Sequence, residues 1–188
     1  VIAHEMAHQW WAHQVIGADM QGATMFSESF AEYSSLMTMK SIAKTPMSMR
    51  EFLKYNHHRY LRGRSGEVDK ELPLYKVENQ QYIHYGKGSI ILYALQDYIG
   101  ENNVNTAMRN FLDEFKHKKP PYPTSLDFIR HLEPQVPDSM KYLIKDWIKE
   151  ITLYDNRMKT AICKRLDNGK YLTTVGIESY KMKADTIG

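Results

Sequence analysis

The spacing of apolar residues along the chain predicts a mainly helical fold. The clearest case is residues 102–118, where Val104, Met108, Phe111 and Phe115 recur at intervals of three and four residues. Comparable patterns predict helices over about residues 1–16, 26–41, 46–62, 82–99, 102–118 and 125–132, with a last helix starting at 137.

Glycine, proline and capping residues mark the expected ends of these helices. Thr45-Pro46 has the form of an N-cap followed by proline at the first helical position. Gly17 and Gly100 are expected to close the helices that precede them. Residues 67–80 are polar and contain Pro73, so we expect a long loop there.

The pattern changes near Arg157, where the helical periodicity ends. Residues 159–164 and 171–180 flank Asp167-Asn168-Gly169, and this sequence is typical of a β-hairpin turn. We therefore expect a helical subdomain over residues 1–154. Residues 155–188 would be the opening hairpin of a β-rich carboxy-terminal domain.

Composition narrows the possible classes of protein. Of 188 residues, 43% are hydrophobic and 12% aromatic, which is enough for the core of about one domain. The net charge of +3 comes from mixed signs and does not indicate a nucleic-acid partner. The single cysteine, Cys163, excludes an internal disulfide. No apolar run reaches the length of about 18 residues that a membrane-spanning helix needs.

The strongest chemical signal is His4-Glu5-Met6-Ala7-His8, followed by Glu28 in the next expected helix. Residues four apart on an α-helix differ by about 40° around its axis, so His4 and His8 can bind one ion. Two imidazoles and a carboxylate leave a fourth zinc position open, as a catalytic zinc site requires. The alternative is an ordinary amphipathic helix with two exposed histidines. The form and context of the motif favour the metal site.

These residues resemble the zinc aminopeptidases of the aminopeptidase N family, within the gluzincin clan. The resemblance rests on the His-Glu-x-x-His sequence, on Ser27-Glu28-Ser29-Phe30-Ala31-Glu32 and on Tyr85-Gly86-Lys87-Gly88, and it covers about residues 1–154. It implies a thermolysin-like helical catalytic subdomain that hydrolyses peptide bonds.

The resemblance also implies the roles of individual residues. One zinc ion per chain would be held by His4, His8 and Glu28. Glu5 would act as the general base on the attacking water, and Tyr85 would donate a hydrogen bond to the oxyanion. Considered alone, Tyr85 would be an ordinary core tyrosine, but the adjacent Lys87-Gly88 favours the catalytic role.

Other polar residues near the motif have more than one interpretation. Glu32 lies one helical turn beyond Glu28, where it either accepts the outer N–H of a ligand histidine or is a solvated surface residue. His13 falls about 180° from His4 on a helical projection, so we expect it to be structural. We interpret Trp10 and Trp11 as core or lid aromatics.

The sequence departs from the family pattern in three respects. Nineteen residues separate His8 from Glu28, one more than usual, and Ser27 and Ser29 replace the family's Asn and Gly. The Gly-x-Met-Glu-Asn loop, which holds the substrate's amino terminus, is absent. We therefore expect the chain to be a segment of a longer protein, with this loop in a missing upstream domain. By itself the segment should then be weak or inactive.

These observations together predict zinc-dependent removal of amino-terminal residues from peptides. One alternative is an endopeptidase or another hydrolase that uses the same site. Another is a catalytically silent regulatory or binding module of a transporter, although the presence of Glu5 and Tyr85 argues against it. The sequence also resembles a bacterial branch that is often fused to membrane proteins of the ABC-transporter permease type. That branch implies a membrane-associated full-length protein.

Overall fold

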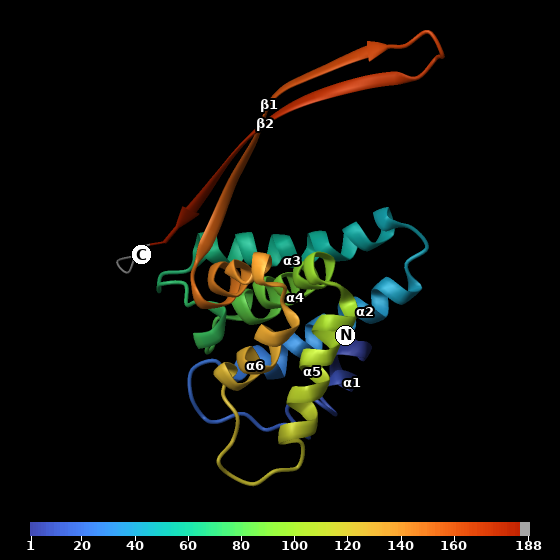
Figure 1. The fold of residues 1–188 in the computed structure, drawn as a ribbon. Coiled ribbons are helices and arrows are strands. Elements are labelled where there is room, and N and C mark those ends of the chain that lie inside the picture. Colours follow the sequence, from blue (N-terminus) through green and yellow to red (C-terminus); the bar gives the residue numbers. More distant parts are fainter. Residues whose placement is uncertain (185–188) are drawn as a thin grey trace. The chain divides into compact units, whose positions relative to one another are not determined.

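The computed structural model describes residues 1–184 and separates into two units, Val1–Glu150 and a second beginning at Ile151. The first unit contains all the helices drawn in Figure 1. No helix within residues 1–184 is both long and apolar enough to cross a membrane. The α-helices are α1 (Ile2–Ala7), α2 (Phe30–Ile42), α3 (Pro46–Gly66), α4 (Gly88–Ile99), α5 (Glu101–Phe115) and α6 (Ser125–Leu132).

Shorter helical segments connect these helices. Three have the wider π-helical turn: η1 (Met25–Ser29), η3 (Tyr82–Lys87) and η6 (Ile144–Lys149). Three are 3₁₀ turns: η2 (Leu74–Lys76), η4 (Glu133–Gln135) and η5 (Asp138–Met140). Segments η1 and η3 run directly into α2 and α4, and they carry Glu28 and Tyr85. Both candidate residues therefore lie where the backbone departs from regular α-helix.

The core of the helical unit is built around a group of aromatic rings. Phe30 is fully buried, and its ring centroid lies 4.6 Å from that of Phe128 and 5.0 Å from that of Trp11. Phe26, also buried, packs against Phe111 with ring centroids 5.6 Å apart. Edge-to-face and tilted packing of this kind stabilises the core beyond simple area burial. Phe26 and Phe30 thus anchor the segment that carries Glu28.

The second unit is a two-stranded antiparallel hairpin of β1 (Thr152–Arg165) and β2 (Tyr171–Lys183). Gly169 in the turn has a positive φ of 79°, which glycine adopts without strain. The mainly helical fold with a carboxy-terminal hairpin is therefore confirmed, although both strands are longer than predicted. Whether residues 155–188 begin a β-rich domain stays a prediction.

The prediction of one helix over residues 1–16 is wrong. Helix α1 ends at Ala7, and the chain then turns so that the N–H of Val15 bonds to the Trp10 carbonyl at 3.1 Å. Ala12 has a φ of 105°, which an α-helix does not allow. In this turn the Trp11 carbonyl accepts from the His8 ring at 3.0 Å instead of from the Val15 N–H, and Trp11 and Val15 are both buried. His13 is exposed, but the helical projection used to place it does not apply.

The remaining helices follow the predicted pattern more closely. The side chain of Thr45 caps α3 by accepting the Ser48 N–H at 3.2 Å, and Gly100 ends α4 with a φ of 93°. The last predicted helix is instead divided into η5 and η6.

Candidate metal centre

Three potential metal ligands, two from the α1 segment and one from η1, lie close together. His4 lies in α1, His8 is the residue that caps the helix, and Glu28 comes from η1. One ligand atom from each residue lies within 4.8 Å of the others. The closest approaches to Glu28 Oε2 are 3.4 Å from His4 Nε2 and 3.7 Å from His8 Nε2. The packing of α1 against α2 and the core contacts of Phe30 bring these ligands together.

The donor set fits zinc in chemistry and in spacing. Ligands about 2.0–2.2 Å from the centre of a tetrahedron are about 3.3–3.6 Å apart, close to the two contacts made by Glu28. Glu28 Oε2 is also inaccessible to solvent and has no hydrogen-bond partner within residues 1–184. A buried carboxylate oxygen without a partner costs free energy, and a cation between the three atoms would offset that cost.

Hydrogen bonds orient both imidazole rings toward this point. Nδ1 of His4 lies 2.8 Å from Glu32 Oε2, and Nδ1 of His8 lies 3.0 Å from the carbonyl oxygen of Trp11. A carbonyl can only accept, so Nδ1 of neutral His8 carries the proton; the carboxylate favours the same tautomer in His4. Both Nε2 lone pairs are therefore free to bind a metal. This is the support that metal-binding histidines generally have.

The electrostatics of the site favour a positive charge between the carboxylates. Attraction of the protonated ring to the Glu28 carboxylate, 3.4 Å from Nε2, and then its hydrogen bond to Glu32 raise the pKa of His4 to about 9. His4 in turn lowers the pKa of Glu28, against the effect of burial. Without a metal, a proton on His4 supplies the positive charge that the two carboxylates attract.

The two candidate catalytic side chains border the same site. The Glu5 side chain is exposed, and its charge is one of those that raise the pKa of Tyr85. The ring of Tyr85 is centred 5.7 Å from that of His4. Burial, followed by the Glu28 carboxylate, raises the pKa of Tyr85 to about 12. The hydroxyl consequently keeps its proton at neutral pH and can donate it in a hydrogen bond.

Glu32 is enclosed by groups from distant parts of the chain. Besides the bond to His4, its Oε1 accepts from Asn56 Nδ2 at 3.2 Å, and the same nitrogen lies 3.1 Å from Ser89 Oγ. Asn56 belongs to α3 and is 1% exposed. The sequence analysis missed Asn56, because nothing in its neighbourhood indicates that α3 packs against α2 at this point.

Two further residues near Tyr85 were also missed. The guanidinium carbon of Arg59 lies 4.2 Å from the centre of the Tyr85 ring, a cation–π arrangement. The ring of buried His84 also contacts the Tyr85 ring, and the two ring centroids are 4.4 Å apart. Helical spacing places Asn56 and Arg59 on neighbouring positions of one face of α3, but only the fold shows which face it is.

The structure explains how serine is accommodated at position 29, where the family pattern has glycine. The Ser29 hydroxyl, fully buried, donates to the carbonyl of His84 at 2.7 Å and so joins the Glu28 segment to the Tyr85 segment. A Cβ on Gly88 would come within 2.2 Å of the same Ser29 oxygen. Serine at position 29 is therefore accommodated because position 88 has no side chain.

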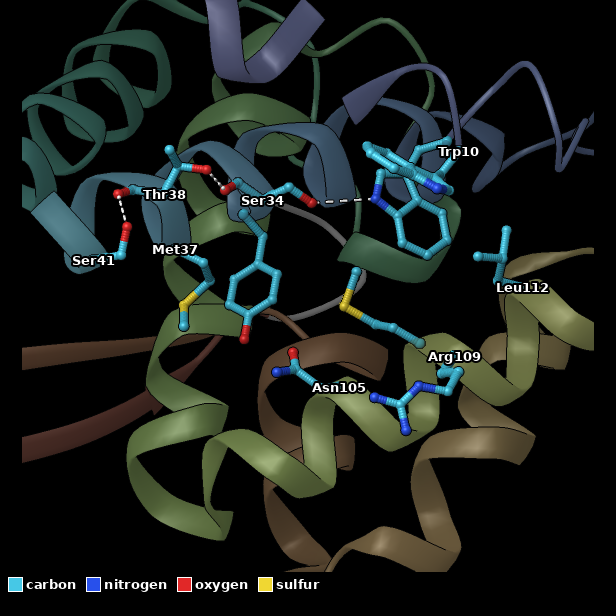
Figure 2. A pocket seen from close by; sticks show the side chains of 11 residues that line it. Trp10, Ser34, Met37, Thr38, Ser41, Asn105, Arg109 and Leu112 are labelled. Atoms are coloured by element: carbon cyan, nitrogen blue, oxygen red, sulfur yellow. Dashed lines mark hydrogen bonds between the residues drawn. The ribbon is translucent and has the colours of Figure 1, made fainter. Parts of the chain in front are cut away.

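A separate hollow of about 550 Å³ lies between α2 and α5, and none of the candidate ligands lines it (Figure 2). Its wall includes Trp10, which is 45% exposed, and Arg109. Trp11 also lines it but is buried, and its indole N–H donates to Ser34 Oγ at 3.2 Å. Trp11 is thus a core residue, and Trp10 belongs to the surface.

Comparisons with known proteins agree with this arrangement. The model of the peptidase family M1 domain matches residues 1–147. Tricorn protease-interacting factor F2 of Thermoplasma volcanium is 31% identical over 119 residues, which are 60% of this chain and 15% of that protein. Leucyl aminopeptidase of Saccharolobus solfataricus is 28% identical over 132 residues, or 62% of this chain and 16% of that protein. The chain thus spans less than a fifth of the length of these relatives.

A solved structure has a similar fold. The crystal structure of an M1 zinc metallopeptidase from Deinococcus radiodurans, bound to the substrate Tyr-Ser-Ala, superposes with a TM-score of 0.59 at 20% identity. The match covers 78% of this chain and 32% of that one. At this identity the likeness concerns the fold.

Proposed function

The chain belongs to peptidase family M1, and we propose that the intact protein containing it is a zinc-dependent aminopeptidase. The observation that carries the proposal is the convergence of His4 Nε2, His8 Nε2 and Glu28 Oε2, with the Glu28 oxygen buried and unbonded within residues 1–184. These three residues would hold one zinc ion. Glu32, through its bond to Nδ1 of His4, would keep that imidazole in the orientation that metal binding needs.

The chemistry needs an electrophile, a base and a donor to the oxyanion. Zinc held there would polarise the peptide carbonyl and make a water molecule acidic enough to attack near neutral pH. The Glu5 carboxylate would accept the proton of the attacking water and pass it to the leaving amine. The Tyr85 hydroxyl would donate a hydrogen bond to the carbonyl oxygen as that oxygen gains negative charge.

The proposal also specifies that the enzyme removes residues from the amino terminus of a peptide and does not cleave within it. Relatives with aminopeptidase names, such as the leucyl aminopeptidase of Saccharolobus solfataricus, favour it over endopeptidase action. Fusion to a membrane protein, and a membrane-associated location, stay predictions of the sequence resemblance.

Metal content and substrate blocking test the proposal together. We would assay the intact protein on leucine p-nitroanilide and on its N-acetylated form, alongside the Glu28→Ala, Glu5→Gln and His13→Ala variants. We expect one zinc per chain in the parent, Glu5→Gln and His13→Ala proteins, and loss of zinc in Glu28→Ala. Glu5→Gln should lower kcat by about a hundredfold or more. His13→Ala, an exposed histidine outside the site, should behave as the parent.

Two results would contradict the proposal in different ways. Tight zinc binding by Glu28→Ala would show that the third ligand is misassigned. Equal turnover of the free and acetylated substrates would leave zinc hydrolysis intact but exclude dependence on a free amino terminus.

A further inference from the structure

A buried ionic cluster lies directly behind the segment that carries Tyr85. We call it the Glu71 cluster; its members are Tyr60, Arg64, Glu71 and Lys87. The Glu71 carboxylate is 4% exposed and forms ion pairs with both Arg64 and Lys87. It also accepts from the Tyr60 hydroxyl, at 3.1 Å and 3.3 Å from its two oxygens. None of these four residues is a candidate metal ligand.

The cluster ties together three parts of the chain. Tyr60 and Arg64 come from α3, Glu71 comes from the segment between α3 and η2, and Lys87 is the last residue of η3. The Lys87 side chain is 9% exposed, so its charge is compensated by Glu71 and not by solvent. Loss of either partner would leave a buried charge without a counter-ion.

Tyr85 lies two residues before Lys87 on the same short helical segment. Between them, Gly86 packs against the backbone of α3: a Cβ there would lie 3.1 Å from the Tyr60 nitrogen and 3.2 Å from the Asn56 carbonyl oxygen. Arg59, from the same helix, covers the ring of Tyr85. The contact with α3 at Gly86 and the ion pair at Lys87 thus hold η3 in place together with the Ser29 hydrogen bond to His84.

A buried ionic cluster of this kind fixes the positions of its members more than it stabilises the fold. Burying an ion pair costs desolvation free energy that the attraction between the charges only partly repays, and apolar replacements of such pairs are often as stable. An oxyanion donor, by contrast, must lie within a narrow range of distances from the reacting oxygen. A small rotation of η3 would move the Tyr85 hydroxyl out of that range.

We propose that Glu71, acting through its ion pair with Lys87, is a positioning residue for Tyr85. Its loss would reduce stabilisation of the transition state while leaving substrate and metal binding unchanged. The inference rests on the proposed function, because it needs Tyr85 to be the oxyanion donor.

The test uses the intact zinc-loaded protein and variants at the cluster and at Tyr85. Glu71→Gln should lower kcat about tenfold or more, with KM within about twofold of the parent and zinc content unchanged. Lys87→Arg keeps the ion pair and should retain most of the parent kcat. The triple variant Arg64→Met/Glu71→Leu/Lys87→Met replaces all three charged groups with apolar ones; it should recover the melting temperature of the parent but not its kcat.

A double-mutant cycle with Tyr85→Phe separates positioning from a general structural effect. Since Glu71 acts only through Tyr85, adding Glu71→Gln to Tyr85→Phe should produce no further loss of kcat. A crystal structure of Glu71→Gln should show the Tyr85 hydroxyl displaced from Glu28. Glu101→Gln is the matched control, because Glu101 forms an exposed ion pair with Lys40 at 2.9 Å, and it should leave kcat unchanged.

The possible failures are distinguishable. If Tyr85→Phe is slow but Arg64→Met/Glu71→Leu/Lys87→Met has the parent kcat, the positioning role is wrong and the proposed function stands. Additive losses in the cycle would likewise overturn positioning alone. If Tyr85→Phe itself has the parent kcat, the role of Tyr85 in the proposed function is wrong, and the positioning role falls with it.

Discussion

Replacing Glu32 with Gln should weaken zinc binding by an amount that depends on pH. The substitution keeps the shape of the side chain but removes the charge from a hydrogen bond of 2.8 Å to His4 Nδ1. Both side chains are largely buried, with exposures of 19% for Glu32 and 10% for His4. A hydrogen bond to a charged group contributes about 1.5–3 kcal/mol, so the zinc Kd should rise by about 10- to 100-fold.

Protonation of His4 reduces that difference at lower pH. With a pKa of about 9 in the metal-free protein, His4 must lose a proton before it can bind zinc. The apparent zinc affinity of the parent should therefore fall about tenfold for each pH unit below that pKa. Glu32→Gln removes one of the two carboxylates that raise the pKa, so protons compete less strongly in the variant. The ratio of variant to parent Kd should be largest above pH 9 and smaller at pH 7.

Competition with a zinc chelator of known affinity measures the zinc Kd of the parent and of the variant. We would determine Kd for the parent and for Glu32→Gln at pH 7 and at pH 9.5, with Glu51→Gln as a control for an exposed glutamate on α3. Equal affinities of variant and parent at pH 9.5 would show that Glu32 does not support the ligand. A ratio that does not change with pH would show that the carboxylate does not control protonation of His4.

Three further predictions concern catalysis, packing and pH. Tyr85→Phe should lower kcat about a hundredfold without changing zinc content, as steady-state kinetics and metal analysis would show. Phe30→Ala should lower the free energy of unfolding by about 3–5 kcal/mol in denaturant titrations, because the ring is fully buried among other aromatics. Phe52 is exposed, so Phe52→Ala should lower the free energy of unfolding much less. In the metal-free protein the folded pKa of His4 is raised above its ordinary value of 6.5 to about 9. Its contribution to stability should then be complete below about pH 6.5 and be lost as pH rises through 9, a dependence that thermal melts of a His4→Gln variant should lack.

Sequence alone was sufficient where the determining interactions are local. His4 and His8 share a helical face because they are four residues apart, and both lie within one turn of the end of α1. The cap at Thr45 and the end of α4 at Gly100 follow from backbone conformations that those residues favour. The hairpin was predictable from its turn, since Asn-Gly adopts the required twist with little strain.

Tertiary structure decided what depends on residues far apart in the chain. Helix α1 stops at Ala7 although the local pattern favours a longer helix, and the carbonyl of Trp11 then accepts from the His8 ring instead of from an N–H one turn further on. Asn56 reaches Glu32, Arg59 covers Tyr85, and Glu71 pairs with Lys87, although each partner lies 16 or more residues away. No periodicity in the sequence identifies such pairs, because they form only when several helices pack together and bring buried polar groups from distant parts of the chain within hydrogen-bonding distance.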